Sequence, residues 1–204
     1  GNDNSVLGYQ ALKNNTTGAS NVAIGKDALL ANTGGSNNVA IGSEAGSINQ
    51  STSSIAIGGS AGRTNQSAGA IGIGYVSGDL NQGSSSIAIG PNAAQANQSN
   101  QSIAIGFAAG QNNQGQDAIA IGTFAGQSNQ AANSIAINAA GTTSPLDPAY
   151  AGFYVDPIRS AAQTNSLFYN TSTKEITYGS SSGNFVDLTT NQTIAGKKTF
   201  SADV

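Results

Sequence analysis

A glycine returns at a nearly constant interval along the first two thirds of the chain, where it closes a short apolar segment. The spacing between successive copies is 17 twice and then 16 six times, counted to a last repeat in which asparagine replaces the glycine. The aligned positions are Gly8, Gly25, Gly42, Gly58, Gly74, Gly90, Gly106, Gly122 and Asn138. Such a fixed period is typical of repeat proteins, in which each repeat stacks on its neighbours.

The residues before each glycine alternate between large and small side chains. Residues two apart in a strand share one face, so the large residues face one way and the small residue faces the other. We expect the large residues, which begin with Val22 and Val39, to fill the interior, and the small residues to form a tight face that contacts other chains. The expected core ladder is Ile24, Ile41, Ile55, Ile57, Ile71, Ile73, Ile87, Ile89, Ile103, Ile105, Ile119, Ile121, Ile135 and Ile137. The expected contact face is Ala23, Ala40, Ala56, Ala88, Ala104, Ala120 and Ala136.

A single repeat is too short to bury its own isoleucines, whereas stacked repeats bury a continuous column. The pattern therefore predicts an all-β fold, a parallel β-solenoid in which each turn is one repeat of about 16–17 residues. At a strand spacing of about 4.8 Å, eight turns would form a rod on the order of 40 Å long. An exposed stripe of small apolar residues is a liability in a monomer, so we expect a homo-oligomer.

An asparagine follows seven residues after each glycine, and from Asn49 onward a glutamine comes next. The column is Asn15, Asn32, Asn49, Asn65, Asn81, Asn97, Asn113 and Asn129. One interpretation is a turn residue whose amide stacks on its copies in neighbouring turns. The other is a stripe that binds a glycan or another surface.

Composition excludes several classes of function. Charged residues make up 8% of the chain, and the net charge of −3 comes from scattered single charges, so no basic stripe exists to bind nucleic acid. The chain has no cysteine and no histidine, the commonest ligands of transition metals. No apolar run approaches the length of a membrane span. We therefore expect no nucleic-acid partner, no metal, no cofactor and no membrane span.

Acidic residues offer little for catalysis. In the repeat region only Asp27 and Glu44 occupy equivalent positions, two residues after their glycines. A hydrolase would need paired carboxylates within reach of one bond, and we expect these two on a solvated corner instead. The sequence predicts that the chain is not an enzyme.

The composition changes after residue 141. Three of the four prolines lie between residues 145 and 157, and eight of the twelve aromatic residues lie beyond residue 149. Two strand-like segments, 166–170 and 175–178, predict a β-hairpin. We expect a β-roll head at 1–141, a neck at 142–183 and the start of a fibre shaft at 184–204. The neck aromatics are Phe153, Tyr154, Phe168, Tyr169 and Tyr178, expected to pack in a core or between chains.

The repeats resemble the head repeats of trimeric autotransporter adhesins. The resemblance is carried by segments 21–25 and 38–42 and by the later Ser-Ile-Ala-Ile-Gly repeats, each of which is followed by a small residue three positions after its glycine. Similar repeats occur in tail-fibre proteins of bacteriophages and large viruses. The resemblance covers about residues 5–141 and implies a left-handed β-roll in a homotrimer. The segments 153–159 and 167–179 are similar to a neck element of viral fibres, and 187–200 is similar to fibre shafts.

These observations predict a rigid fibre segment for surface attachment, on a cell surface or a virion fibre outside the cell. Its partners would be identical chains, in a homotrimer or a longer fibre, and an unknown surface receptor such as a glycan. Two alternatives remain open. One is a polysaccharide depolymerase-like spike enzyme, and the other is a self-assembling extracellular matrix or ice-binding solenoid.

Overall fold

The computed structural model describes residues 3–141, 145–160 and 165–180. The chain divides into two compact units, Gly1–Ile158 and Arg159–Val204, and each is described by itself. The described residues contain strands and turns and no helix. The predicted all-β fold is therefore confirmed.

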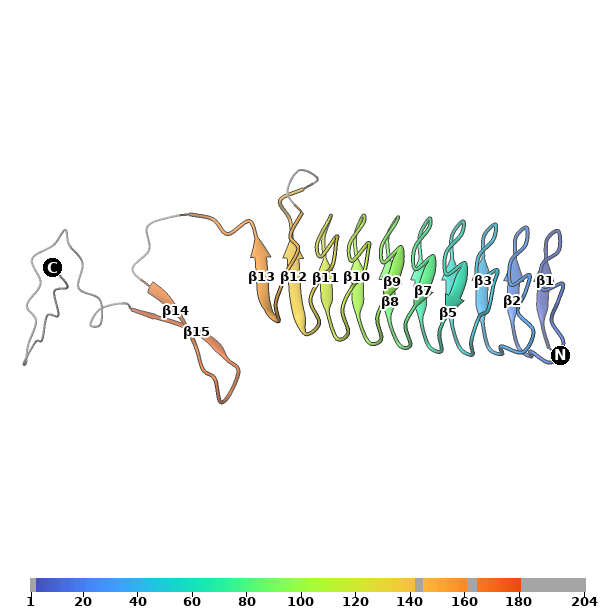
Figure 1. The fold of residues 1–204 in the computed structure, drawn as a ribbon, viewed down its shortest axis with the longest axis horizontal. Coiled ribbons are helices and arrows are strands. Elements are labelled where there is room, and N and C mark those ends of the chain that lie inside the picture. Colours follow the sequence, from blue (N-terminus) through green and yellow to red (C-terminus); the bar gives the residue numbers. More distant parts are fainter. Residues whose placement is uncertain (1–2, 142–144, 161–164, 181–204) are drawn as a thin grey trace, which may run out of the picture. The chain divides into compact units, whose positions relative to one another are not determined.

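The first unit is a parallel β-solenoid of about nine turns. Its main sheet has ten parallel strands in the order β1-β2-β3-β4-β6-β8-β10-β11-β12-β13 (Figure 1). The strands are β1 (Ser5–Leu7), β2 (Val22–Ile24), β3 (Val39–Ile41), β4 (Ile55–Ile57), β6 (Ile71–Ile73), β8 (Ile87–Ile89), β10 (Ile103–Ile105), β11 (Ile119–Ile121), β12 (Ser134–Asn138) and β13 (Gly152–Asp156). Each repeat supplies one strand, as the period predicts.

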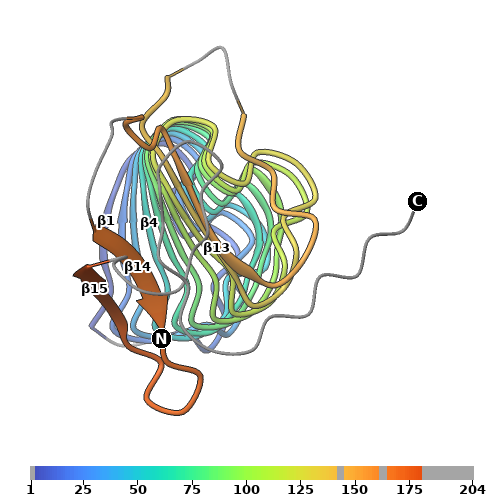
Figure 2. The same ribbon diagram turned by 90° about the vertical axis from the view of Figure 1, so that its left-hand side faces the viewer.

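A second, shorter sheet lies on another side of the solenoid and contains β5 (Thr64–Gln66), β7 (Leu80–Gln82) and β9 (Ala96–Gln98). Isolated parallel bridges extend it, from Ala31 through Ile48 to Thr64 and from Ala96 through Asn112 to Ser128. Figure 2 looks along the solenoid and shows the turns superposed on one another. Equivalent residues therefore form columns that follow the axis.

Left-handed backbone conformations make the corners of each turn tight. In one turn, Ser53, Ser60 and Asn65 have φ angles of 62°, 54° and 57°. Their main-chain N–H groups donate to the preceding turn, whereas that of Ile55 donates to Ala70 of the following turn. The closing glycine is required where turns meet: Gly74 has φ +130°, and a Cβ atom there would lie 2.7 Å from the carbonyl carbon and oxygen of Gly90.

The interior is lined by the alanines, so the expectation that isoleucine fills it was wrong. Ala23, Ala40, Ala56, Ala88, Ala104, Ala120 and Ala136 are all 0–1% exposed. The isoleucines of the expected core ladder point outward, and Ile24, Ile105 and Ile137 are 37%, 37% and 36% exposed. The alternation places the two sets on opposite faces but does not say which face is inside. So short a turn, with tight corners, encloses too little space for two isoleucines.

Buried amides fill the rest of the interior. The side-chain Nε2 of Gln98 donates to the main-chain oxygens of Ile87 at 2.9 Å and Ser102 at 3.3 Å, and to Oε1 of Gln114 at 3.1 Å. The same contact to the isoleucine carbonyl recurs from Gln66, Gln82, Gln114 and Gln130. Because the glutamines start on the second sheet and bond carbonyls of the first, the two sheets face each other across the interior.

The longer turns at the start of the solenoid are built differently. Asn38 accepts from the main chain of Ser54 and donates its own N–H to Asn21 Oδ1 at 2.9 Å. Asn32 is buried and exchanges two hydrogen bonds with Gly35, at 2.9 and 3.0 Å. Buried asparagines and the fully buried Leu29 occupy the interior of these turns in place of the later glutamines.

The solenoid continues past the expected boundary at residue 141. Leu146 bridges Ala125, and the carbonyl of Pro148 accepts from the N–H of Ala131 at 2.9 Å. Strand β13 then pairs in parallel with β12, with Tyr154 beside Ala136. The prolines therefore lie in the last turn, and the boundary at 141 was wrong, since the compact unit ends at Ile158.

The described part of the second unit is a β-hairpin of β14 (Asn165–Tyr169) and β15 (Ile176–Ser180). Asn170 Oδ1 accepts from the N–H groups of Ser172 and Thr173, and Lys174 has φ +63°, so the turn is closed by its own side chain. The predicted hairpin is confirmed. The predicted shaft at 184–204 lies outside the described residues.

Candidate interaction surfaces

An apolar stripe runs along the outer face of the ten-stranded sheet. It consists of two adjacent columns, in which equivalent residues of successive strands pair in register. The columns are Val22, Val39, Ile55, Ile71, Ile87, Ile103, Ile119 and Ile135, and Ile24, Ile41, Ile57, Ile73, Ile89, Ile105, Ile121 and Ile137. Phe153 and Val155 of β13 continue them by one row. Sequence reasoning found these residues but placed them inside the chain.

The stripe leaves a large apolar area in contact with water. Seven of its isoleucines are 36–39% exposed, among them Ile41 and Ile105 at 37%, and the other nine residues of the two columns are half-buried. Soluble monomers rarely expose contiguous apolar patches of more than a few hundred Å², and larger patches mark sites of association. The geometry therefore suits contact with another apolar sheet along the whole solenoid.

The second sheet carries an exposed ladder of asparagine amides. Each Nδ2 donates to Oδ1 of the next turn at 2.9 to 3.0 Å, from Asn49 through Asn65, Asn81, Asn97 and Asn113 to Asn129. The prediction of stacked turn amides is thus confirmed for these six residues. It was wrong for Asn15 and Asn32, whose Nδ2 atoms bond Gly18 and Gly35 within their own turns.

A second amide ladder lies two positions away from the first in the sequence. Nε2 of Gln111 donates to Oε1 of Gln95 at 2.9 Å, and Nε2 of Gln127 donates to Oε1 of Gln111 at 3.2 Å. These bonds point toward the N-terminus, whereas those of the asparagines point toward the C-terminus. We call the six asparagines and these three glutamines the amide face. Sequence reasoning missed this second ladder. It noted the glutamines that follow the asparagines but did not place them in the interior.

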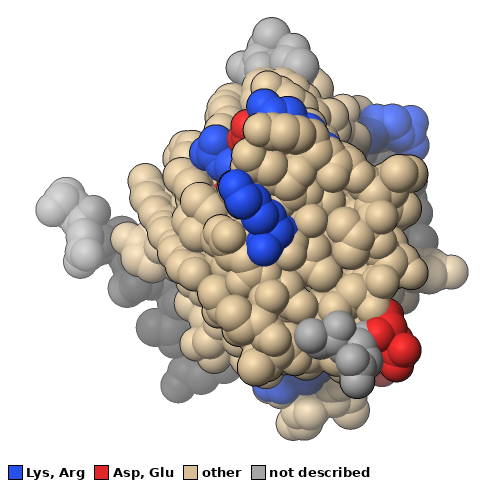
Figure 3. Space-filling view, turned by 90° about the vertical axis from the view of Figure 1, so that its right-hand side faces the viewer, with Lys and Arg blue, Asp and Glu red and all other residues tan. Residues whose placement is uncertain are grey.

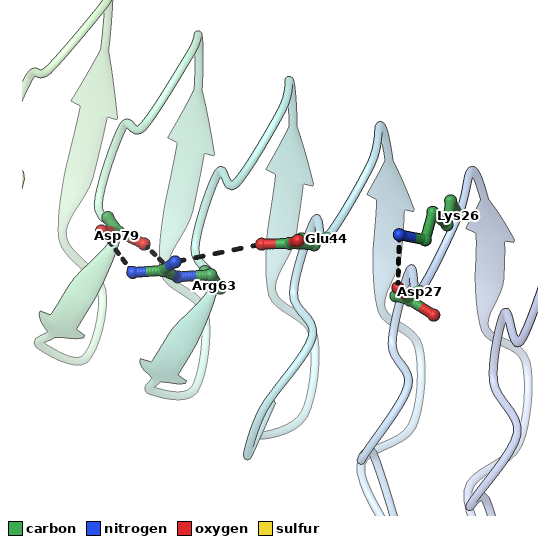
Figure 4. Close-up of polar contacts among 5 residues, drawn as sticks. All are labelled: Lys26, Asp27, Glu44, Arg63 and Asp79. Atoms are coloured by element: carbon green, nitrogen blue, oxygen red, sulfur yellow. Dashed lines mark hydrogen bonds and ion pairs between the residues drawn. The ribbon is translucent and has the colours of Figure 1, made fainter.

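Asp27 and Glu44 each form an ion pair with a basic side chain (Figure 4). Asp27 lies 3.6 Å from Lys26, and Glu44 lies 3.9 Å from Arg63. Arg63 also contacts Asp79 at 2.9 Å. Burial raises the pKa of Asp79, although the Arg63 guanidinium opposes that shift.

Charged residues make up only 8% of the chain. Figure 3 views the N-terminal end of the solenoid, where uncharged side chains cover most of the surface. Among the described residues, no group of three or more acidic side chains could hold a metal ion. No helix in the same part of the chain has the length and apolar character to cross a membrane.

The five neck aromatics belong to both units. Phe153 and Tyr154 lie in β13, where Tyr154 extends the buried alanine column and is itself half-buried. The other three lie in the hairpin. There Leu167 pairs with Tyr178, and Tyr169 pairs with Ile176, so these four residues share one face, with 55 to 76% of each exposed. A two-stranded hairpin is marginal by itself, so this apolar face also needs a partner.

The chain was compared with protein families, curated proteins and solved structures. No protein-family model, curated protein or solved structure matches the chain. The resemblance to trimeric autotransporter heads and viral tail fibres therefore stays a prediction.

Proposed function

We propose that this chain is a segment of a homotrimeric fibre, a rigid rod outside the cell that attaches a cell or a virion to a surface. The observation that supports it best is the apolar stripe, which follows the solenoid from end to end. In the proposed assembly three solenoids lie parallel and their stripes meet along a common axis. The trimer number and a left-handed roll rest on the resemblance to adhesin heads.

The energy available from the stripe is large. Burying an isoleucine fully contributes about 1.5–3 kcal/mol, so a side chain that is about a third exposed contributes roughly 0.5–1 kcal/mol. Seven isoleucines of the stripe are 36–39% exposed, which gives roughly 4–7 kcal/mol per chain before the cost of association, and the nine half-buried residues of the stripe add to this sum. This exceeds what single scattered contacts between chains would supply.

The arrangement also differs from the oligomer that the sequence suggested. The alanines cannot form the interface because they are buried within each chain. In this proposal the isoleucines take that role. The solenoid then supplies stiffness, since each turn is hydrogen-bonded to both neighbours.

Light scattering on the purified chain tests the proposal. The expected mass is three times 20.2 kDa. The variant Ile73→Asp/Ile89→Asp/Ile105→Asp should fall to the mass of one chain, because each substitution would bury carboxylates against one another. The matched control, Ser85→Asp/Gln101→Asp/Asn133→Asp, changes exposed residues off the stripe and should stay trimeric. A wild-type chain that runs as a monomer at high concentration would refute the proposal.

The depolymerase alternative gains no support from the carboxylates. Asp27 forms an ion pair with its sequence neighbour Lys26, and Glu44 forms one with Arg63 of the next turn. Retaining and inverting glycosidases instead hold two carboxyl groups on either side of one bond.

A further inference from the structure

We infer that the amide face binds a neutral polysaccharide whose chain runs along the solenoid axis. The inference rests on the proposed function, because it names where a surface-attached rod makes contact and what it recognises. The amide face stays free in such an assembly. Gln66 points from the second sheet across the interior to the Ile55 carbonyl, so its neighbour Asn65 faces away from the apolar stripe.

The amide ladders leave half of their bonding capacity unused. A side-chain amide has two N–H donors and an oxygen with two lone pairs. Along the asparagine ladder, one donor and one lone pair of each inner amide are used between turns. Each turn therefore offers one N–H group and one lone pair to a ligand, repeated about every 4.8 Å. Over six asparagines this array extends for roughly 24 Å.

The array is ordered before any ligand binds. Each asparagine of the ladder from Asn49 to Asn129 has φ between 54° and 57°, and its amide is held by its neighbours. An ordered side chain loses little rotamer entropy on binding, which otherwise costs about 0.5–1.5 kcal/mol for each side chain. A weak contact at each turn can then add up over the length of the ladder.

The chemistry of the face favours sugar over other polymers. From Leu80 to Asn129, the amide face and the column between its two ladders contain no charged residue. A phosphate backbone or an acidic glycan would require cations. Sugar hydroxyls both donate and accept, which matches one free donor and one free acceptor at each turn. Leu80 and Ala96, which pair in the column next to the asparagine ladder, offer apolar contact for the C–H face of a sugar ring.

A peptide strand fits less well. Peptides bind sheets through unpaired main-chain groups at an edge. On this face the main chain is already paired between turns, as Leu80 N–H is with the Gln95 carbonyl at 2.9 Å. Only side-chain groups remain available.

Glycine variants test the site because the asparagines have left-handed backbone angles that glycine accepts. The test variant is Asn81→Gly/Asn97→Gly/Asn113→Gly, where φ is 56°, 57° and 54°. The matched control is Ser85→Gly/Gln101→Gly/Asn133→Gly, with φ of 54°, 59° and 57° at another corner of the solenoid. Binding is measured by co-sedimentation with cellulose and chitin and by affinity electrophoresis in mannan and dextran, with alginate and heparin as anionic comparisons.

We expect wild-type protein to bind at least one of the four neutral polymers. The test variant should bind it about tenfold more weakly or worse, since three hydrogen-bonding amides are lost. The control should bind like wild type. Absence of binding to all four, binding only to alginate or heparin, or equal loss in the test and control variants would overturn the inference.

Folding and assembly are followed on the same samples. If the test variant does not fold, Gln95→Ala/Gln111→Ala/Gln127→Ala removes the second ladder without touching a left-handed residue, and the same loss is expected. Mass from light scattering separates the two proposals. A monomer that binds through the amide face would refute the fibre and support the site, whereas a trimer that fails to bind would do the reverse.

Discussion

Enlarging one buried alanine should damage the folded chain more than any change on the neighbouring isoleucine. Ala104 is fully buried, and Ala88 and Ala120 lie directly beside it on the adjacent strands. A Cβ atom built on Gly110 would lie only 3.1 Å from the Ala104 Cβ, so no space remains on that side either. The substitution Ala104→Leu adds three carbon atoms to this position.

The expected cost is at least the usual penalty for overpacking, about 1–3 kcal/mol, from a total stability of about 5–15 kcal/mol. For a chain of this size, about 1 kcal/mol lowers the melting temperature by roughly 2–4 °C. Ala104→Leu should therefore lower it by roughly 2–12 °C. Thermal unfolding followed by circular dichroism measures this shift.

The adjacent residue provides the control. Ile105 is 37% exposed, so Ile105→Leu keeps volume on the outer face and should cost under about 1.5 kcal/mol. The reasoning would be refuted if Ala104→Leu were tolerated while Ile105→Ala collapsed the β-structure of a single chain. That result would mean that isoleucine is inside, as the sequence alone suggests.

Three further substitutions test other parts of the solenoid. Gln98→Leu keeps the volume but removes the donor that the Ile87 carbonyl and Gln114 Oε1 share, so chemical denaturation should show a loss of about 1–3 kcal/mol. Gly74→Ala should prevent soluble folding, because the added Cβ atom would lie 2.7 Å from the Gly90 carbonyl. The control Gly69→Ala should express and unfold cooperatively, because its added Cβ atom would lie 3.7 Å from the Ser85 Oγ atom, at ordinary contact distance. Burial raises the pKa of Asp79 above its ordinary value of 3.8. The Asp79 carboxyl group therefore stabilises the folded state fully below pH 3.8, where it is protonated, and this stabilisation is lost as the pH rises through the raised pKa. The melting temperature of Asp79→Asn relative to wild type should therefore be higher at about pH 7 than at about pH 3.5, and no change between the two would contradict the burial argument.

The period and the strand positions could be predicted from the sequence because glycine and isoleucine recur on a fixed schedule. The direction of the side chains could not. Ala56 and Ile57 point to opposite faces of the strand in either case, so their alternation does not show which of them faces the interior. That choice depends on the width of the interior, which the corners of the turn determine. Those corners depend on left-handed residues of many types, such as Ser60, Val76 and Phe124, which no sequence pattern marks.

The candidate site was predicted in part. The asparagine column was visible, and its six-membered ladder is present from Asn49 onward. The parallel ladder of Gln95, Gln111 and Gln127 was missed because these residues replace Arg63 and Asp79 of earlier turns, which hides the column. The final turn was missed because the prolines and the change of composition after residue 141 indicated a boundary, whereas Pro148 contributes its carbonyl to the Ala131 N–H.

The strict register between turns couples two properties that most proteins adjust separately. A tandem duplication of one repeat would lengthen the rod by about 4.8 Å and, in the same event, add one row to the apolar stripe and one amide to the outer ladder. In the proposed trimer, the length of the solenoid and the area of contact between chains would then increase together. Unequal recombination between neighbouring repeats is therefore enough to produce a family of rods of graded length.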